Sequence, residues 1–232
     1  MTYTSLELYK RTLGKIGVVA DVLPMFGTLE HGEGESSELR ARVMQSIPAL
    51  KTASADQLRL VGVFGAVHDL ELLVQRLGEL HVHAKEHGLH VVICLLGRSA
   101  ALRAQLEQSM LTQGCEALLF EANDTGDANI ASMMREMDAG ITTTPQDCIG
   151  KSSAAACFRD QGLPVLSCSA GAFVGTSAAP FFLVEDFLHD GLLLSPPRYA
   201  ARDRVLDAAE KVESDFIQAS NGNAGMVAPV LS

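Results

Sequence analysis

Two adjoining stretches, Asp138-Ala-Gly-Ile-Thr-Thr-Thr-Pro145 and Asp147-Cys-Ile-Gly-Lys-Ser-Ser153, decide the fold of this chain. The first is typical of a short apolar strand that runs into a Thr/Pro loop. The second opens a helix of small residues, which leads to Gly162-Leu-Pro-Val165 and a further strand. Backbone N–H groups exposed at a helix N-terminus, with a lysine beside them, form a natural seat for a phosphate or diphosphate. We therefore expect the chain to bind a nucleotide-like anion.

Short apolar runs alternate with helical patterns on both sides of this segment. Strands are predicted at 58–64, 89–96, 117–121, 139–143 and 165–169, and helices at 69–87, 100–112, 130–137 and 152–160. The alternation predicts an α/β fold of the Rossmann-like type, with a mostly parallel sheet and helices on both faces. Ligands of such sheets bind beyond the carboxyl ends of the strands. The loops expected there are 65–68, 97–98, 121–127 and 142–151.

The chain divides into three regions. We expect residues 1–57 to form an N-terminal connector with one helix, predicted at 37–47. We expect residues 58–200 to form a nucleotide-binding, Rossmann-like domain and residues 201–232 to form a C-terminal helix and tail.

The composition narrows the range of partners. The 232 residues are 47% hydrophobic, which supports a real core, and the formal net charge of −10 opposes broad attraction to nucleic acid or anionic membrane. No apolar run approaches the roughly 18 residues of a membrane-span candidate, and the N-terminus lacks the apolar region of a secretory signal. The five cysteines are scattered singly, as is typical of reduced thiols. We expect a cytoplasmic protein with no nucleic-acid partner and no membrane span.

The order of the rim motifs resembles the C-terminal, donor-binding half of GT-B glycosyltransferases of the family 1/4 type. The matching segments are Val22-Leu-Pro-Met-Phe-Gly27, Val61-Gly-Val-Phe-Gly65 with His68, Leu95-Leu-Gly-Arg98, Gly140-Ile-Thr-Thr-Thr-Pro145, Ile149-Gly-Lys-Ser152 and Gly162-Leu-Pro-Val165. The resemblance implies one GT-B half that binds a nucleotide-diphosphate sugar as its substrate and needs no cofactor. If the chain is an enzyme, the resemblance implies hexosyl transfer.

The sequence departs from the family pattern in two ways. Many retaining members carry two glutamates eight positions apart near this helix start, where the chain has Asp147 and Ala155. Ribose recognition through the second carboxylate is therefore not expected. In addition, only about 57 residues precede the first strand of the nucleotide half, fewer than the roughly 100–150 of a usual domain. The acceptor surface is then expected from a separate chain, a further segment or a second copy in a homo-oligomer.

The chemistry of transfer selects the candidate site residues. A leaving diphosphate is stabilised by fixed N–H dipoles and cations, without covalent chemistry by the protein. The candidate donor-binding residues are Gly65, Ala66, His68, Arg98, Thr144, Gly150, Lys151 and Ser152, and the candidate catalytic residues are Arg98, Asp147 and Lys151. Plainer interpretations stay open for each: Lys151 as a solvated lysine at a helix start, Asp147 as a helix cap, and His68 as a structural histidine.

A metal site is not expected. His83 and His87 share a face of one predicted helix, but no third ligand is evident and the chain has no Asp-x-Asp pair. A nucleoside-triphosphatase P-loop is excluded because Pro145 stands where that motif needs a glycine. Two alternatives to a donor domain remain. One is a non-catalytic nucleotide-binding or protein-interaction module, and the other is a different doubly wound protein, such as a nucleotide-sugar epimerase or a small-molecule binder.

Overall fold

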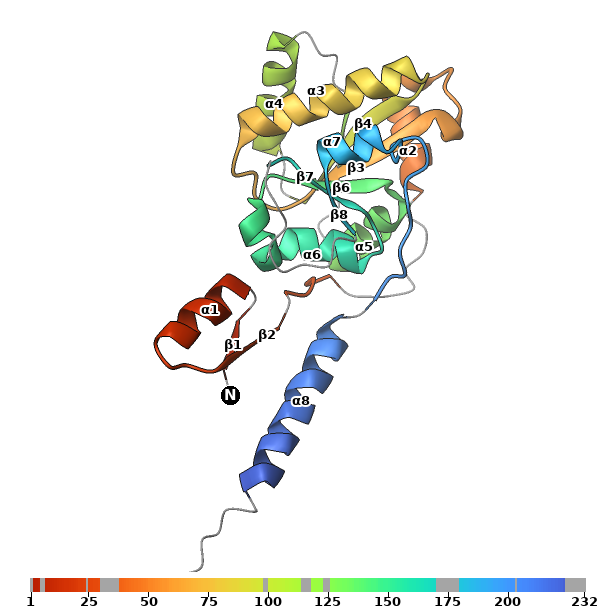
Figure 1. Ribbon diagram of the computed structural model, residues 1–232. Coiled ribbons are helices and arrows are strands. Elements are labelled where there is room, and N and C mark those ends of the chain that lie inside the picture. The colour runs from red at the N-terminus through yellow and green to blue at the C-terminus, as the bar shows by residue number, and fades with distance from the viewer. Residues whose placement is uncertain are drawn as a thin grey trace, which may run out of the picture.

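The computed structural model describes residues 2–4, 7–23, 25–29, 38–97, 100–113, 118–122, 126–169, 180–202 and 204–223. Its centre is a sheet of six parallel strands, β3 (Leu58–Val63), β4 (His90–Leu96), β5 (Leu118–Ala122), β6 (Ala139–Thr142), β7 (Val165–Ser167) and β8 (Phe181–Leu183). Their spatial order is β5-β4-β3-β6-β7-β8 (Figure 1). This is the doubly wound Rossmann order, in which the direction of winding reverses between the first and fourth strands, here β3 and β6. The predicted Rossmann-like α/β fold is confirmed.

Helices cover both faces of the sheet (Figure 1). One face packs against α2 (Leu39–Ser46), α5 (Asp127–Glu136) and α6 (Ser153–Asp160), and the other against α3 (Leu70–Glu86), α4 (Ala100–Thr112) and α7 (Val184–His189). Alternate residues of β4 enter different cores: Val92 and Cys94 face the first set of helices, and Val91 and Ile93 the second. Burial on both faces explains why the strands are continuous apolar runs rather than alternating ones.

Two glycines let α6 approach the sheet closely. Gly62 of β3 and Gly140 of β6 are register partners in neighbouring strands. A Cβ at Gly140 would lie 2.2 Å from Cγ of Phe158, and a Cβ at Gly62 would lie 2.8 Å from its Cε1. The fully buried Phe158 ring therefore rests on bare backbone where β3 and β6 meet. This contact fixes the position of α6 against the sheet.

Asp138 anchors the start of β6. Its two carboxylate oxygens each lie 2.7 Å from Nη2 of Arg40 in α2. One of them also accepts a hydrogen bond of 2.7 Å from the Leu60 amide of β3. Asp138, the residue before β6, thus links the start of this strand to the neighbouring strand β3 and to helix α2.

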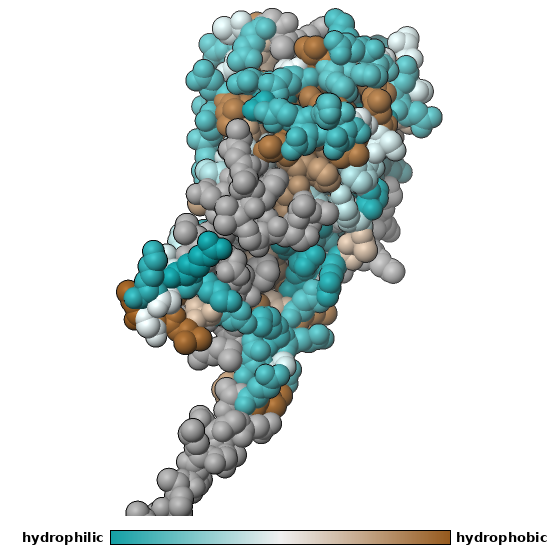
Figure 2. Space-filling model, in the orientation of Figure 1, coloured by the Kyte–Doolittle hydropathy of each residue, from teal (hydrophilic) through white to brown (hydrophobic). Residues whose placement is uncertain are grey.

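An N-terminal β-α-β unit lies beside this body (Figure 1). It consists of β1 (Thr2–Thr4), α1 (Glu7–Lys15) and β2 (Ala20–Val22), and β1 pairs in parallel with β2. The long C-terminal helix α8 (Arg204–Asn223) contacts this N-terminal unit, since Nζ of Lys211 lies 2.9 Å from a carboxylate oxygen of Asp21. Figure 2 shows apolar surface at the outer end of this unit and along α8. Exposed apolar residues there include Ile16, Val19, Val205, Leu206, Phe216 and Ile217.

The predicted elements between residues 37 and 169 are all present, and most of their ends agree within about three residues. Several short elements were not predicted: β1, α1, β2, β8 and α7, together with the 3₁₀ helices η1 (Pro48–Leu50), η2 (Ala55–Gln57) and η3 (Gln146–Lys151). In the described part of the chain, no helix is both long and apolar enough to cross a membrane.

Candidate functional site

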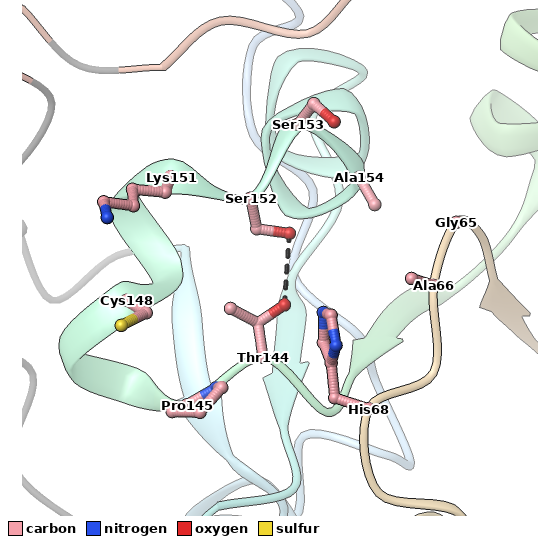
Figure 3. Close-up of a pocket in the computed structure, with 10 residues that line it drawn as sticks. All are labelled: Gly65, Ala66, His68, Thr144, Pro145, Cys148, Lys151, Ser152, Ser153 and Ala154. Atoms are coloured by element: carbon pink, nitrogen blue, oxygen red, sulfur yellow. Dashed lines mark hydrogen bonds between the residues drawn. The ribbon is translucent and has the colours of Figure 1, made fainter.

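A pocket of about 540 Å³ opens where β3 and β6 end. The helices that follow these strands, α3 and α6, pack on opposite faces of the sheet, so the two connecting loops part and leave a crevice between them. The residues that line the pocket are Gly65, Ala66, His68, Thr144, Pro145, Cys148, Lys151, Ser152, Ser153 and Ala154 (Figure 3). The volume falls in the range of small-ligand sites, about 300–1,000 Å³.

A chain of hydroxyl groups fixes the wall of the pocket. The Thr144 hydroxyl lies 3.0 Å from that of Thr142. It also lies 3.3 Å from that of Ser152 (Figure 3). Thr143, between them, accepts a 2.8 Å hydrogen bond from the His68 amide, which ties the β3 loop to the β6 loop. Because Thr142, Thr143 and Thr144 are all buried, these bonds satisfy polar groups that would otherwise cost free energy.

Ser152 begins α6. Its side-chain oxygen accepts a 3.2 Å hydrogen bond from the Ala155 amide, which makes it the N-cap residue. The next two residues, Ser153 and Ala154, line the pocket. The first turn of α6, which carries the positive end of the helix dipole, therefore borders the cavity.

Gly65 allows the β3 loop to approach that helix. Its φ of +78° belongs to the left-handed region that favours glycine, and a Cβ there would lie 3.0 Å from the Ala154 side chain. The backbone at 65–66 thus forms the wall opposite the start of α6.

A second helix, α3, also begins at this crevice, but its N-terminus is capped by a charge. Oδ1 of Asp69 accepts a 2.9 Å hydrogen bond from the Leu72 amide. Neither residue is among those that line the pocket. The carboxylate compensates the positive end of α3, whereas the hydroxyl of Ser152 leaves that of α6 uncompensated.

The charge around the pocket contrasts with that of the whole chain. The net charge is −10, yet among the lining residues that the structure describes none is acidic and one is a lysine. The ammonium of Lys151 contacts Tyr9 of α1, where it lies 4.0 Å from the ring centroid and hydrogen-bonds the hydroxyl. The N-terminal unit therefore reaches the rim of the pocket through the same lysine.

The structure gathers most of the predicted donor-binding residues. Gly65, Ala66, His68, Thr144, Lys151 and Ser152 all line the pocket, whereas Gly150 lies in η3 and is not among the lining residues. Arg98 and the side chain of Asp147 lie outside the described residues. Sequence reasoning did not select Pro145, Cys148, Ser153 and Ala154. The expected helix start at 150–152 also differs: residues 146–151 form η3, and α6 begins only after the Ser152 cap.

Comparison with known proteins gives matches in structure alone. No protein-family model matches the chain, and no curated protein matches it significantly. The chain superposes on alpha,alpha-trehalose 6-phosphate synthase from Burkholderia multivorans with a TM-score of 0.54 and 13% identity, covering 100% of this chain and 61% of that one. Sucrose-phosphate synthase from Thermosynechococcus elongatus gives a TM-score of 0.53 and 14% identity, with coverage of 96% and 58%.

The chain has the fold of one GT-B half. It spans about three-fifths of the length of the two synthases. The structural match confirms the resemblance that the rim motifs indicated. At 13–14% identity it establishes the fold, and the chemistry of the site rests on the geometry above.

Proposed function

We propose that this chain is the donor-binding half of a glycosyltransferase and that it binds a nucleotide-diphosphate sugar in the crevice between β3 and β6. The observation that carries the proposal is the pocket at the switch point, bordered by the Ser152-capped start of α6 and by Lys151. Helix N-termini at this position of a doubly wound sheet are suited to diphosphates because their amides and dipole face the ligand.

The diphosphate is placed against α6. There the phosphate oxygens accept hydrogen bonds from the backbone amides of Ser153 and Ala154 and from the ammonium of Lys151. The ammonium turns from Tyr9 to the phosphate when the donor binds. As negative charge develops on the leaving diphosphate, these fixed groups stabilise it with little reorganisation. Gly65 and Ala66 let the opposite backbone approach the ligand closely.

Arg98 and Asp147 complete the proposed machinery. In the sequence, Arg98 comes two residues after the end of β4, and β4 is the strand next to β3. A guanidinium there would pair two phosphate oxygens. Asp147 lies in η3, whose neighbours Cys148 and Lys151 line the pocket, and its role would be to orient the sugar hydroxyls.

The acceptor is proposed to bind on the side of the N-terminal unit. That unit contacts the pocket rim through Tyr9, and its described sheet has only the two strands β1 and β2. Parallel sheets are normally larger and covered on both faces. A further α/β segment, a separate acceptor-binding chain or a second copy would extend it and supply the acceptor surface.

Calorimetric titration tests the donor site. UDP, GDP and ADP are titrated into the full chain beside uridine, guanosine and adenosine. We expect one diphosphate to bind with a much lower Kd than its parent nucleoside, because the phosphates provide the charged contacts. Failure of all three diphosphates to bind would refute the donor-domain proposal while leaving the fold intact.

Cys148 provides an independent reporter because it lines the pocket. Burial raises the pKa of Cys94 and Cys157, and that of Cys168 to about 12, so these three thiols should react slowly. Alkylation followed by peptide mapping measures each thiol separately. The nucleoside diphosphate that binds should slow alkylation of Cys148 in proportion to the fraction of pockets that it occupies. An unchanged alkylation rate at saturating diphosphate would place the ligand elsewhere.

A second candidate function is a non-catalytic nucleotide-binding or interaction module. It is favoured by the lining of the pocket, because none of the ten described lining residues carries a carboxylate that could act as a base. An assay for nucleoside diphosphate released from the corresponding nucleotide sugar, in the absence of acceptor, distinguishes this module from a catalytic donor domain. A donor domain that retains catalysis hydrolyses the sugar slowly, whereas a module binds it intact.

A further inference from the structure

The last turn of α3 carries three potential metal ligands. His83, Glu86 and His87 each offer one ligand atom, and these atoms all lie within 4.8 Å of one another. The two histidine rings lie one helical turn apart, with centroids 4.6 Å apart. The sequence pattern showed the histidine pair but no third ligand, and the structure brings the Glu86 carboxylate to it.

The hydrogen bonds of the two imidazoles leave nitrogens for an ion. Nδ1 of His87 lies 2.9 Å from the carbonyl oxygen of His83. Because a carbonyl only accepts, a hydrogen bond here requires the proton on Nδ1, and in the neutral ring Nε2 then presents a lone pair. Metal-binding histidines are commonly oriented in this way, by donation of the other ring N–H to a backbone carbonyl. In His83, Nε2 is buried and has no hydrogen-bond partner among the described residues, so a bound ion would give this ring a partner.

The position of the cluster favours a cation. His87 is the C-cap residue of α3, and the carboxyl end of a helix carries partial negative charge. Glu86 adds a full negative charge, and the chain as a whole has a net charge of −10. Lys85, the cationic neighbour in sequence, contributes to a separate pocket of about 420 Å³, which His81 also lines.

We propose that His83, Glu86 and His87 bind a divalent transition-metal ion of the Zn²⁺ class. Two imidazole nitrogens and one carboxylate oxygen, with water in the fourth position, form a ligand set that suits Zn²⁺, whereas Mg²⁺ and Ca²⁺ prefer oxygen alone. Bonds of about 2.0–2.2 Å require the three atoms to approach slightly, and the exposed side chains of Glu86 and His87 have room to rotate. The ion would hold the last turn of α3 closed, at the end of the sheet opposite to the pocket.

Titration of ZnCl₂ into the full chain, prepared without a polyhistidine tag, tests the site. We expect one equivalent to bind to the wild type and to His81→Ala, a control on the same helix outside the cluster. Glu86→Gln and His87→Ala should each raise the Kd at least about tenfold. The same amount of Zn²⁺ should raise the Tm of the wild type and the control but not that of the two variants. MgCl₂ should give no binding.

Two results would overturn the proposal. One is the absence of Zn²⁺ binding by the wild type, and the other is binding that Glu86→Gln and His87→Ala leave unchanged. Both substituted side chains are exposed, and circular dichroism verifies that the variants remain folded.

Discussion

Two helices, α3 and α6, begin at the same crevice, but they have different N-cap residues. Asp69 caps α3 with a carboxylate, and Ser152 caps α6 with a neutral hydroxyl. A carboxylate already compensates the positive end of a helix, whereas a hydroxyl satisfies an amide without adding charge. The doubly wound fold thus places two similar helix N-termini at the crevice. The charge of the N-cap residue determines which N-terminus can still attract an anion.

The surroundings of the two helix ends agree with this difference. Ser153 and Ala154 of α6 line the pocket beside Lys151, whereas no residue of α3 does so. The position of α6 rests on the contact of Phe158 with the paired glycines of β3 and β6. We therefore propose that the diphosphate binds at the N-terminus of α6 and not at that of α3.

The largest expected effect comes from removing the ring that holds α6 in place. Phe158→Ala should lower the free energy of unfolding by roughly 3–5 kcal/mol and also weaken the diphosphate, because α6 loses its contact with Gly140. Leu77→Ala, a buried residue of α3, should cost a similar roughly 2–5 kcal/mol and leave diphosphate affinity unchanged. Urea unfolding and titration of the folded variants measure both quantities. Equal loss of affinity in the two variants would show that the site does not depend on α6 in particular.

The next effect concerns the charge beside α6. Lys151→Ala should weaken binding of the nucleoside diphosphate by roughly 1.5–3 kcal/mol, the range for hydrogen bonds to charged groups. The parent nucleoside should be affected much less, and Lys85→Ala, an exposed lysine at the other end of the sheet, should change neither. Calorimetric titration measures the affinities. If nucleoside and diphosphate weaken equally, Lys151 does not contact the phosphates.

Ser152→Asp makes the cap of α6 resemble that of α3. The introduced carboxylate should still accept the Ala155 amide, but its charge should weaken the diphosphate by roughly 0.3–2 kcal/mol, as expected for a charge at a helix end. Ser152→Asn, a neutral cap of similar strength, serves as the matched control. Unchanged affinity in Ser152→Asp would contradict the role assigned to the α6 dipole.

Asp69→Asn should have the smallest effect. Asparagine caps about as well as aspartate, so stability should change by less than about 1 kcal/mol, and diphosphate affinity should stay the same. A gain or loss of affinity, measured by the same titration, would show that α3 also senses the ligand.

Much of this arrangement could be predicted from the sequence because the sheet has a strong local signal. The apolar runs of β3, β4 and β6 are buried on both faces, and the loops after β3 and β6 carry Gly65 and Thr144, which line the pocket. The sequence therefore predicts Gly65, Thr144, Lys151 and Ser152, all of which line the pocket.

The rest depends on features without a local pattern. The Gly150-Lys151 pair suggests a helix start, but both residues belong to the 3₁₀ helix η3, so the first turn of α6 begins later, at Ser153 and Ala154. The three-residue strands β1 and β2 are too short to show periodicity. The contact of Tyr9 with Lys151 joins residues 142 positions apart, and no sequence pattern indicates it.

The most direct test of the central claim is to record which backbone amides sense phosphate. Two-dimensional ¹H–¹⁵N NMR spectra are followed while the nucleoside diphosphate that binds, or pyrophosphate alone, is added to the full chain. If the diphosphate binds at α6, we expect large shifts for the amides of Ser153, Ala154 and Ala155 at the start of α6, and little change for those of 70–72 at the start of α3. Shifts confined to 70–72, or equal shifts at both helix ends, would contradict it.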